Sequence, residues 1–344
     1  MSGTVRVGVI GCGRIGRLHA ENLAHLVPGA ELVAVADPVA SAAQEVAAAC
    51  PGVIPYEDPR RLLDDASIDA LVVASPTDTH ARFLWEASTR GKHVFCEKPI
   101  DLDLERARAS VRSASRAGVI LQVGFNRRFD PTFARIASLV RSGDVGAVHL
   151  VRITSRDPAP PPVEYLRSSG GLYFDMSIHD LDMARFIAYD EPVSVFATGS
   201  VLVDSEIGDA GDVDTAALVL RYRGGALALI DNSRRAVYGY DQRVEVFGES
   251  GCLSSDHRTA TAVTRWDAEG QRREPPLNFF LERYRESYLA EMKAFIEAVH
   301  EQRPAPVDGD DGIRAIELAL AAQQSAIERR PILLEEISVK WRAA

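Results

Sequence analysis

The chain has 344 residues, of which 46% are hydrophobic and 26% charged, proportions that exclude a disordered or fibrous protein. Its 39 lysine and arginine residues against 49 aspartate and glutamate residues give a formal net charge of −10. This balance argues against a nucleic-acid or anionic-membrane surface, because both require clustered positive charge.

Short apolar runs and helical segments alternate over the first third of the chain. The runs are rich in Val, Ile and Leu at consecutive positions, which is typical of strands buried on both faces of a parallel sheet. The expected strands are Val5–Ile10, Glu31–Ala36, Ala70–Ala74, His93–Glu97 and Val119–Gly124, and the expected helices are Arg14–Leu26, Val39–Cys50, Thr79–Arg90 and Leu104–Ala117. The fold class is therefore α/β, and residues 1–124 are expected to form a doubly wound Rossmann domain.

Beyond Gly124, strand-like runs follow one another through turns. The expected strands are Val148–Thr154, Val193–Val203, Thr215–Tyr222, Ala226–Asn232, Arg243–Phe247 and Thr261–Trp266, followed by helices near Phe280–His300 and Gly312–Glu328. The proline-rich segment Asp157–Val163 is expected to be an extended loop. Residues 125–344 are thus predicted to form an α+β domain with a large, mostly antiparallel, open-faced sheet, suited to substrate binding and oligomerisation.

Cysteine spacing and hydropathy indicate the cellular compartment of the protein. Cys12, Cys50, Cys96 and Cys252 are far apart and form no C-x-x-C pair, so neither a zinc finger nor a disulfide framework is expected. The N-terminus lacks the order of a secretion signal, and no uncharged apolar stretch approaches the ~18 residues that span a bilayer. We therefore expect a cytoplasmic protein with reduced cysteines.

A glycine-rich motif joins the first strand to the first helix. It reads Gly11-Cys12-Gly13-Arg14-Ile15-Gly16, a G-x-G-x-x-G pattern in the context of a dinucleotide-binding turn. Gly11 suits the tight turn, Gly13 allows a pyrophosphate to approach the backbone, and Gly16 allows close packing of helix and strand. The amides that open the helix would bind the phosphates.

An acidic residue ends the second strand. A carboxylate at Asp37 can accept hydrogen bonds from the adenosine ribose hydroxyls and would repel a 2′-phosphate. Because Pro38 follows, and not an arginine, the sequence favours NAD over NADP.

Two further strand ends carry polar groups. Glu97-Lys98-Pro99 follows a predicted parallel strand, where ligands of open α/β sheets bind, so the Lys98 ammonium could polarise a substrate hydroxyl; the alternative is a surface lysine. Ser75, Pro76 and Thr77 end the preceding strand and suit the cofactor ribose and phosphates. His80 could be either a neighbour of the cofactor or an ordinary surface residue.

A third cluster of reactive residues lies behind Gly170-Gly171. Asp175 and His179 are four residues apart, so they share one face if the segment is helical. A carboxylate beside an imidazole raises its proton affinity and orients it, as a general base requires. The alternatives are a metal site that also includes Asp182, which the missing further histidine or cysteine disfavours, and an ordinary helix start. No metal is expected.

Together, the glycine motif, Glu97-Lys98-Pro99 and Asp175…His179 resemble the glucose-fructose oxidoreductase/inositol dehydrogenase/rhizopine catabolism (Gfo/Idh/MocA) family from Val5 to about Glu328. This resemblance implies that Lys98, Asp175 and His179 form the catalytic group, with the histidine as acid/base. Within the family the chain looks most like the inositol 2-dehydrogenases. The implied reaction is the NAD-dependent oxidation of myo- or scyllo-inositol to 2-inosose.

The resemblance also implies substrate contacts and an assembly. Asn126, Arg127, Asp157 and Tyr288 would contact the polyol, although an aromatic residue at helical spacing, such as Tyr288, is more often part of the core. Asp157 and Ser155 stand where many myo-inositol enzymes carry asparagine and histidine, so the preferred isomer stays open. The family implies a homotetramer formed through open sheet faces. Two alternatives remain: a dehydrogenase of another sugar or sugar nucleotide, and a non-catalytic dinucleotide sensor.

Overall fold

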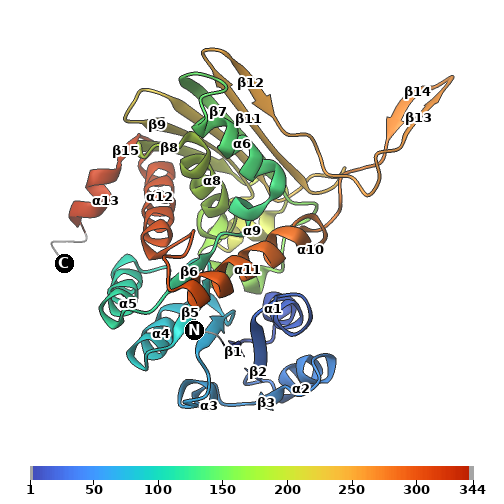
Figure 1. The fold of residues 1–344 in the computed structure, drawn as a ribbon. Helices are drawn as coiled ribbons and strands as arrows, with labels where there is room; N and C mark the ends of the chain where they lie inside the picture. The colour runs from blue at the N-terminus through green and yellow to red at the C-terminus, as the bar shows by residue number, and fades with distance from the viewer. Residues whose placement is uncertain (1–2, 341–344) are drawn as a thin grey trace. The chain divides into compact units, whose positions relative to one another are not determined.

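A computed structural model describes residues 3–340 of the chain. It contains two compact units (Figure 1). Unit 1 consists of the residues up to Phe129 together with Glu286–Ile316, and unit 2 of Asp130–Arg285 together with the residues from Glu317 onward. Within the described residues, no helix combines the length and the apolar character needed to cross a bilayer.

Unit 1 is built on a six-stranded sheet in the order β3-β2-β1-β4-β5-β6. Every strand pair is parallel, which confirms the predicted doubly wound Rossmann sheet. The strands are β1 (Val5–Ile10), β2 (Ala30–Ala36), β3 (Ile54–Tyr56), β4 (Ala70–Val73), β5 (His93–Glu97) and β6 (Leu121–Gly124). The helices between them are α1 (Arg14–His25), α2 (Ala40–Ala49), α3 (Arg60–Leu63), α4 (Thr77–Thr89) and α5 (Leu104–Ala117).

One helix from late in the chain belongs to the core of unit 1. The apolar side chains of α11 (Arg285–Glu301), among them Met292, Phe295 and Ile296, pack with Phe95 of β5 in one buried cluster. The Gln122 side-chain amide of β6 also donates to the backbone carbonyl of Glu291 at 2.7 Å. The division at residues 124 and 125 therefore differs from the observed units, because burial of this apolar helix face joins 286–316 to unit 1.

Unit 2 is built on a seven-stranded sheet in the order β12-β11-β7-β10-β9-β8-β15. All neighbours are antiparallel except β7 and β10, so the predicted mostly antiparallel sheet is confirmed. The strands are β7 (Val148–Arg156), β8 (Pro192–Ser200), β9 (Thr215–Tyr222), β10 (Leu227–Ser233), β11 (Asp241–Gly248), β12 (Gly251–Ser254) and β15 (Ile332–Leu333).

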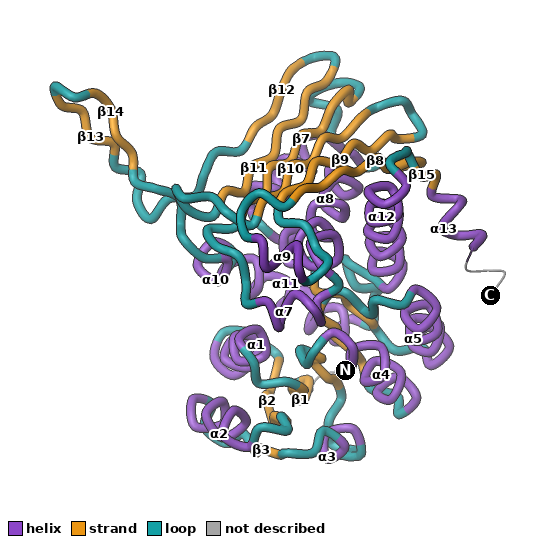
Figure 2. Tube along the Cα trace, turned by 180° about the vertical axis from the view of Figure 1, so that it is seen from behind, coloured by secondary structure: helices purple, strands orange, loops and turns teal. Residues whose placement is uncertain are grey.

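Helices cover one face of this sheet and leave the other open (Figure 2). Residues alternate between buried and exposed along β9 and β10, and the Tyr222 hydroxyl donates to the carbonyl of Ala184 on the covered face at 2.8 Å. The helices of unit 2 are α6 (Pro131–Arg141), α7 (Val163–Ser169), α8 (Ile178–Ala188), α9 (Ser205–Asp209), α10 (Phe280–Arg283) and α13 (Leu334–Lys340); α12 (Gly309–Glu328) begins in unit 1 and ends in unit 2.

Two predicted elements differ from those observed. The run Thr261–Trp266 is not a strand of the main sheet: β13 (Thr264–Asp267) pairs only with β14 (Gly270–Arg273) in a separate hairpin, which projects from the sheet in Figures 1 and 2. The predicted helix Phe280–His300 is interrupted at Tyr284, which caps α10 before α11 begins.

Candidate active site

The glycine loop has the geometry that a dinucleotide phosphate requires. Gly11 has φ +95° and a Cβ there would lie 2.5 Å from the Ala74 carbonyl oxygen, while a Cβ on Gly16 would collide with the Gly11 carbonyl. At Gly13, in contrast, a Cβ would meet no atom within 4 Å, and no side chain caps α1. The loop thus presents an open backbone surface and uncapped helix amides, which fit a bound phosphate.

Asp37, at the carboxyl end of β2, is tied to this loop. Its Oδ2 accepts from the Cys12 amide and its Oδ1 from the Val39 amide, each at 2.8 Å. Burial, with a contribution from the Asp37 charge, raises the pKa of the Cys12 thiol to about 12. Cys12 is therefore an inert thiol, and Asp37 is a fixed carboxylate beside the turn.

His80 of α4 links the ends of two strands. It is 2% exposed, so the alternative of a surface residue is excluded. Its Nδ1 lies 2.8 Å from the Pro99 carbonyl oxygen and its Nε2 lies 2.7 Å from the Ser75 carbonyl oxygen. His80 therefore connects the loop after β4 with the loop after β5.

The loops after adjacent strands of unit 1 bring the predicted residues to the same edge of the sheet. Pro76 is the N-cap of α4, which begins at Thr77. Glu97 ends β5, and the Lys98–Pro99 peptide that follows is cis. Asn126 and Arg127 are buried in a short 3₁₀ helix (Asn126–Phe129) directly after β6. Since parallel strands place their carboxyl ends together, this edge is where a ligand of the sheet binds.

Unit 2 holds the predicted acid–base pair on an irregular helix. Tyr173–Ser177 form a π-helical turn that runs directly into α8, so the four-residue spacing of Asp175 and His179 crosses a change in helical pitch. Both side chains are partly exposed. A π-turn inside an α-helix is often found at functional sites, and here it sits at the residue predicted to be catalytic.

The carboxylate of Asp175 is held by two residues that sequence reasoning did not place in the site. Tyr165 of α7 donates to Oδ1 at 2.8 Å and Arg234 donates from Nη1 to Oδ2 at 3.1 Å. Burial, reinforced by the Asp175 charge, raises the pKa of Tyr165 well above its usual value, so this phenol stays a donor. Arg234 lies 59 positions from Asp175 in sequence, so no local pattern signals this contact.

The predicted substrate residues divide between the units. Asn126, Arg127 and Tyr288 belong to unit 1, whereas Asp157 belongs to unit 2. Tyr288 is 7% exposed and its ring packs edge-on against His19, which agrees with the core alternative. Asp157 follows β7, and its backbone carbonyl accepts from the Ala236 amide at 2.6 Å.

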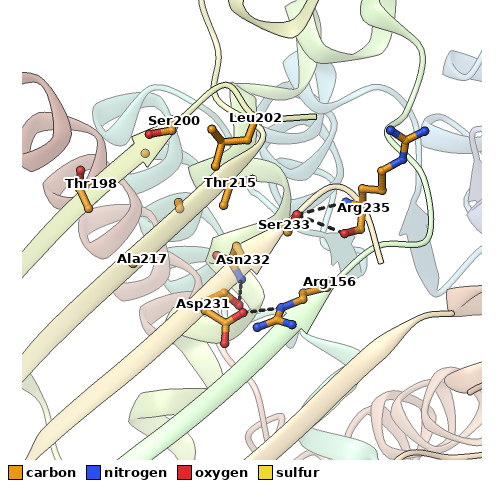
Figure 3. Close-up of a pocket in the computed structure, with 12 residues that line it drawn as sticks. Arg156, Thr198, Ser200, Leu202, Thr215, Ala217, Asp231, Asn232, Ser233 and Arg235 are labelled. Atoms are coloured by element: carbon orange, nitrogen blue, oxygen red, sulfur yellow. Dashed lines mark hydrogen bonds and ion pairs between the residues drawn. The ribbon is translucent and has the colours of Figure 1, made fainter. Parts of the chain in front are cut away.

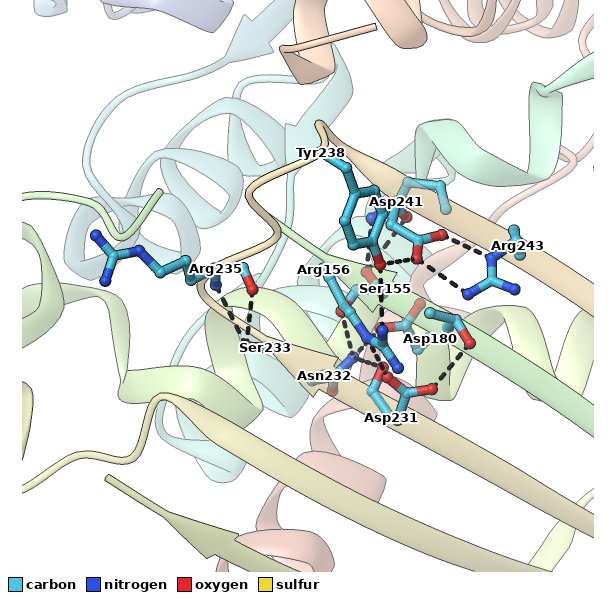
Figure 4. A network of polar contacts seen from close by, with 12 residues as sticks. Ser155, Arg156, Asp180, Asp231, Asn232, Ser233, Arg235, Tyr238, Asp241 and Arg243 are labelled. Atoms are coloured by element: carbon cyan, nitrogen blue, oxygen red, sulfur yellow. Dashed lines mark hydrogen bonds and ion pairs between the residues drawn. The ribbon is translucent and has the colours of Figure 1, made fainter. Parts of the chain in front are cut away.

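The open face of the unit 2 sheet carries a hollow of about 470 Å³ (Figure 3). Arg156 donates to Asp231 at 2.6 Å and to the Tyr238 hydroxyl, which in turn donates to Asp241 at 2.6 Å (Figure 4). None of the predicted catalytic or cofactor residues lines this hollow. It is therefore a feature of the sheet surface distinct from the predicted site.

A Rossmann unit with an open phosphate-binding turn, joined to a sheet unit, is typical of a dinucleotide-binding protein. A family model described as the oxidoreductase family with an NAD-binding Rossmann fold matches residues 5–125, and the Gfo/Idh/MocA C-terminal domain matches residues 133–254. The chain belongs to the Gfo/Idh/MocA family, which confirms the resemblance and the expected NAD cofactor.

Relatives of the chain extend over nearly its whole length. The myo-inositol 2-dehydrogenase of Thermotoga maritima is 50% identical, covering 97% of this chain and 99% of that protein. The inositol 2-dehydrogenase of Rhizobium meliloti is 45% identical, covering 96% and 99%. The structure of a scyllo-inositol dehydrogenase from Lactobacillus casei, with bound NAD(H) and scyllo-inositol, superposes with a TM-score of 0.90 at 30% identity, covering 96% and 99%.

Proposed function

We propose that the protein oxidises a ring secondary alcohol of inositol to 2-inosose with NAD⁺ as hydride acceptor. The observation that carries this proposal is the 50% identity, over 97% of the chain, to a myo-inositol 2-dehydrogenase. The dehydrogenase names of the relatives also disfavour a non-catalytic dinucleotide sensor.

The chemistry divides between the cofactor and the chain. Bound NAD⁺ supplies the hydride acceptor, and the amides after Gly13 together with Asp37 would hold it. We propose that His179 takes the proton from the reacting hydroxyl and that Lys98 stabilises the developing alkoxide. Asp175 orients the imidazole, and its own carboxylate is fixed by Arg234 and Tyr165.

Substrate contacts are assigned to residues with hydrogen-bonding side chains in both units. We propose that Asn126, Arg127 and Asp157 bind the polyol hydroxyls, whereas Tyr288, the fourth predicted contact, packs against His19 in the core of unit 1. Ser155 is fully buried, and its Oγ accepts from the Gln242 side-chain amide at 2.8 Å. Relatives are named for both myo- and scyllo-inositol, and both isomers are proposed substrates.

The assembly proposed is a homotetramer that uses the open face of the unit 2 sheet. Apolar side chains are exposed in a row across several strands of this face, where a single chain would leave them in water. They are Phe196, Val219, Leu227, Phe247 and Leu333, which are 36–50% exposed. A neighbouring copy would cover them and the hollow of Figure 3.

The compartment proposed is the cytoplasm. All four cysteines are free thiols, and three of them, Cys12, Cys50 and Cys96, are buried. Reduced, unpaired cysteines are typical of intracellular proteins.

A substrate panel tests the proposed activity. NADH formation is followed by absorbance with myo-inositol, scyllo-inositol, glucose and a sugar nucleotide. We expect the highest kcat/KM with one of the two inositols. A higher kcat/KM with glucose or the sugar nucleotide would replace inositol as the substrate.

A further inference from the structure

Three acidic or basic side chains from distant parts of the sequence meet in the core of unit 1. His19 of α1, Glu97 of β5 and Glu291 of α11 place their side-chain ligand atoms within 4.8 Å of one another. The His19 Nε2 lies 2.7 Å from Glu97 Oε1. The side chains of His19 and Glu97 are 0% and 13% exposed, and Glu291 is 0% exposed. This triad lies next to Lys98 in sequence, because Glu97 directly precedes it.

The space around the triad is closed. The rings of Phe95 and Tyr288 pack edge-on against the imidazole of His19, with centroids 5.0 and 5.9 Å away. A Cβ on Gly124 would lie 2.9 Å from Glu97 Oε2, so the carboxylate occupies space that only a glycine leaves free.

The charges of the triad do not balance when both carboxyl groups are ionised. Among the described residues, His19 Nε2 contacts Glu97 Oε1, and neither carboxylate oxygen of Glu291 has a hydrogen-bond partner. Tyr288, which packs on His19, and Cys96, which precedes Glu97, are neutral in their usual forms. Two carboxylates at this separation without solvent repel strongly.

Burial, together with the charge of Glu97, raises the pKa of Glu291 well above its ordinary value. A neutral carboxylic acid removes the repulsion and costs far less to bury than a carboxylate. A divalent cation would be the other means of neutralising the site.

We propose that Glu291 carries a proton and acts as a positioning residue, keeping Glu97 against His19 and thereby fixing Lys98. Loss of this proton to water places two like charges side by side, displaces Glu97 and shifts the residue that follows it. The consequence for catalysis rests on the proposed role of Lys98, whereas the proton on Glu291 does not.

Thermal unfolding of the ligand-free protein against pH tests the proton without any substrate. A carboxyl group whose pKa is raised on folding stabilises the protein fully at acid pH and progressively loses that contribution as the pH rises towards the folded value. Glu291→Gln removes this titration, so its Tm relative to wild type should rise by about 2–4 °C per pH unit above pH 5. The exposed Glu297→Gln on the same helix should give a constant difference.

Two outcomes overturn the proton assignment. One is a Tm difference for Glu291→Gln that does not change with pH; the other is a stoichiometric divalent metal in the purified protein whose removal lowers Tm. Should Glu291→Gln fail to fold, infrared spectroscopy of the wild type decides instead. A protonated carboxylic acid band at neutral pH supports the assignment, and its absence refutes it.

The alkaline side of the kcat profile tests the positioning role. In the wild type kcat should fall as Glu291 ionises, and Glu291→Gln should abolish that fall without altering the KM for NAD⁺. An unchanged alkaline profile in a variant that passes the Tm test would leave the proton in place and reject its link to Lys98. Absence of activity with any polyol, with the Tm result intact, would reject only the proposed function.

Discussion

Arg234 holds Asp175 by a hydrogen bond of 3.1 Å from Nη1 to Oδ2, with the arginine side chain 1% exposed. The same guanidinium lies 3.8 Å from Asp212. One buried cation thus faces two carboxylates, one of which is the predicted partner of His179, the proposed acid/base. This ion pair makes the geometry of the acid–base site dependent on a residue 59 positions away in sequence.

Replacing Arg234 should therefore damage both stability and catalysis. Arg234→Met leaves Asp175 and Asp212 without their cation, and breaking a buried pair typically costs about 3–5 kcal/mol. Thermal unfolding measures this loss, and the exposed neighbour Arg235→Met serves as the control with little change. Full retention of Tm and kcat by Arg234→Met would show that Asp175 is held in another way.

His179→Ala should abolish most of the turnover. General base catalysis typically contributes about 10²–10⁴-fold, so kcat with NAD⁺ and inositol should fall by at least that order while the Kd for NAD⁺ stays unchanged. His149→Ala, an exposed histidine of β7, is the matched control. A kcat within a few-fold of wild type would remove His179 from the mechanism.

Asp37→Asn should relax the preference between the two dinucleotides. The change removes the charge that would repel a 2′-phosphate and weakens the acceptor for the ribose. Because hydrogen bonds to charged groups contribute about 1.5–3 kcal/mol, the ratio of kcat/KM for NAD⁺ over NADP⁺ should fall about 10-fold or more. Glu57 is exposed near the same strand ends, so Glu57→Gln should leave this ratio unchanged. The same NAD⁺ over NADP⁺ ratio in Asp37→Asn as in Glu57→Gln would contradict the role of Asp37 in selecting NAD⁺.

Acid should destabilise unit 2 through Asp214. Burial would raise the pKa of this carboxyl, but amide donors from Leu202, Val203 and Asp204 and the Thr215 hydroxyl outweigh it and lower the pKa. A lowered folded pKa stabilises the protein above the unfolded value of about 3.9, and this contribution is lost as the pH falls below it. Asp214→Asn should lower Tm at pH 7, and its Tm should fall less than that of the wild type as the pH is lowered. If the Tm of this variant fell with pH as steeply as that of the wild type, Asp214 would not be the source of the acid sensitivity.

Local patterns in the sequence predict most strands and helices of unit 1 and its parallel sheet. Buried parallel strands are apolar at consecutive positions, so β1 and β5 are predicted with their observed bounds. β3 was missed because it has only three residues, one of them Pro55. The backbone roles of Gly11, Gly13 and Gly16 are also predictable, because they follow from steric rules that act within a few residues.

Long-range packing explains what the sequence could not predict. The apolar face of α11 is visible in the sequence, but nothing local says that it completes unit 1. Arg234 and Tyr165 meet Asp175 only through the tertiary fold. The buried contact between Glu97 and Glu291 likewise cannot be predicted from the sequence, because each residue on its own looks like an ordinary charged residue.

Isotope tracing measures hydride transfer from the inositol ring to the cofactor directly. The protein is incubated with NAD⁺ and either myo-inositol deuterated at C2 or scyllo-inositol deuterated at every ring carbon, and the NADH formed is analysed by mass spectrometry. We expect one deuterium per NADH from at least one of the two isomers. NADH that carries no deuterium, or no NADH from either isomer, would contradict this hydride transfer.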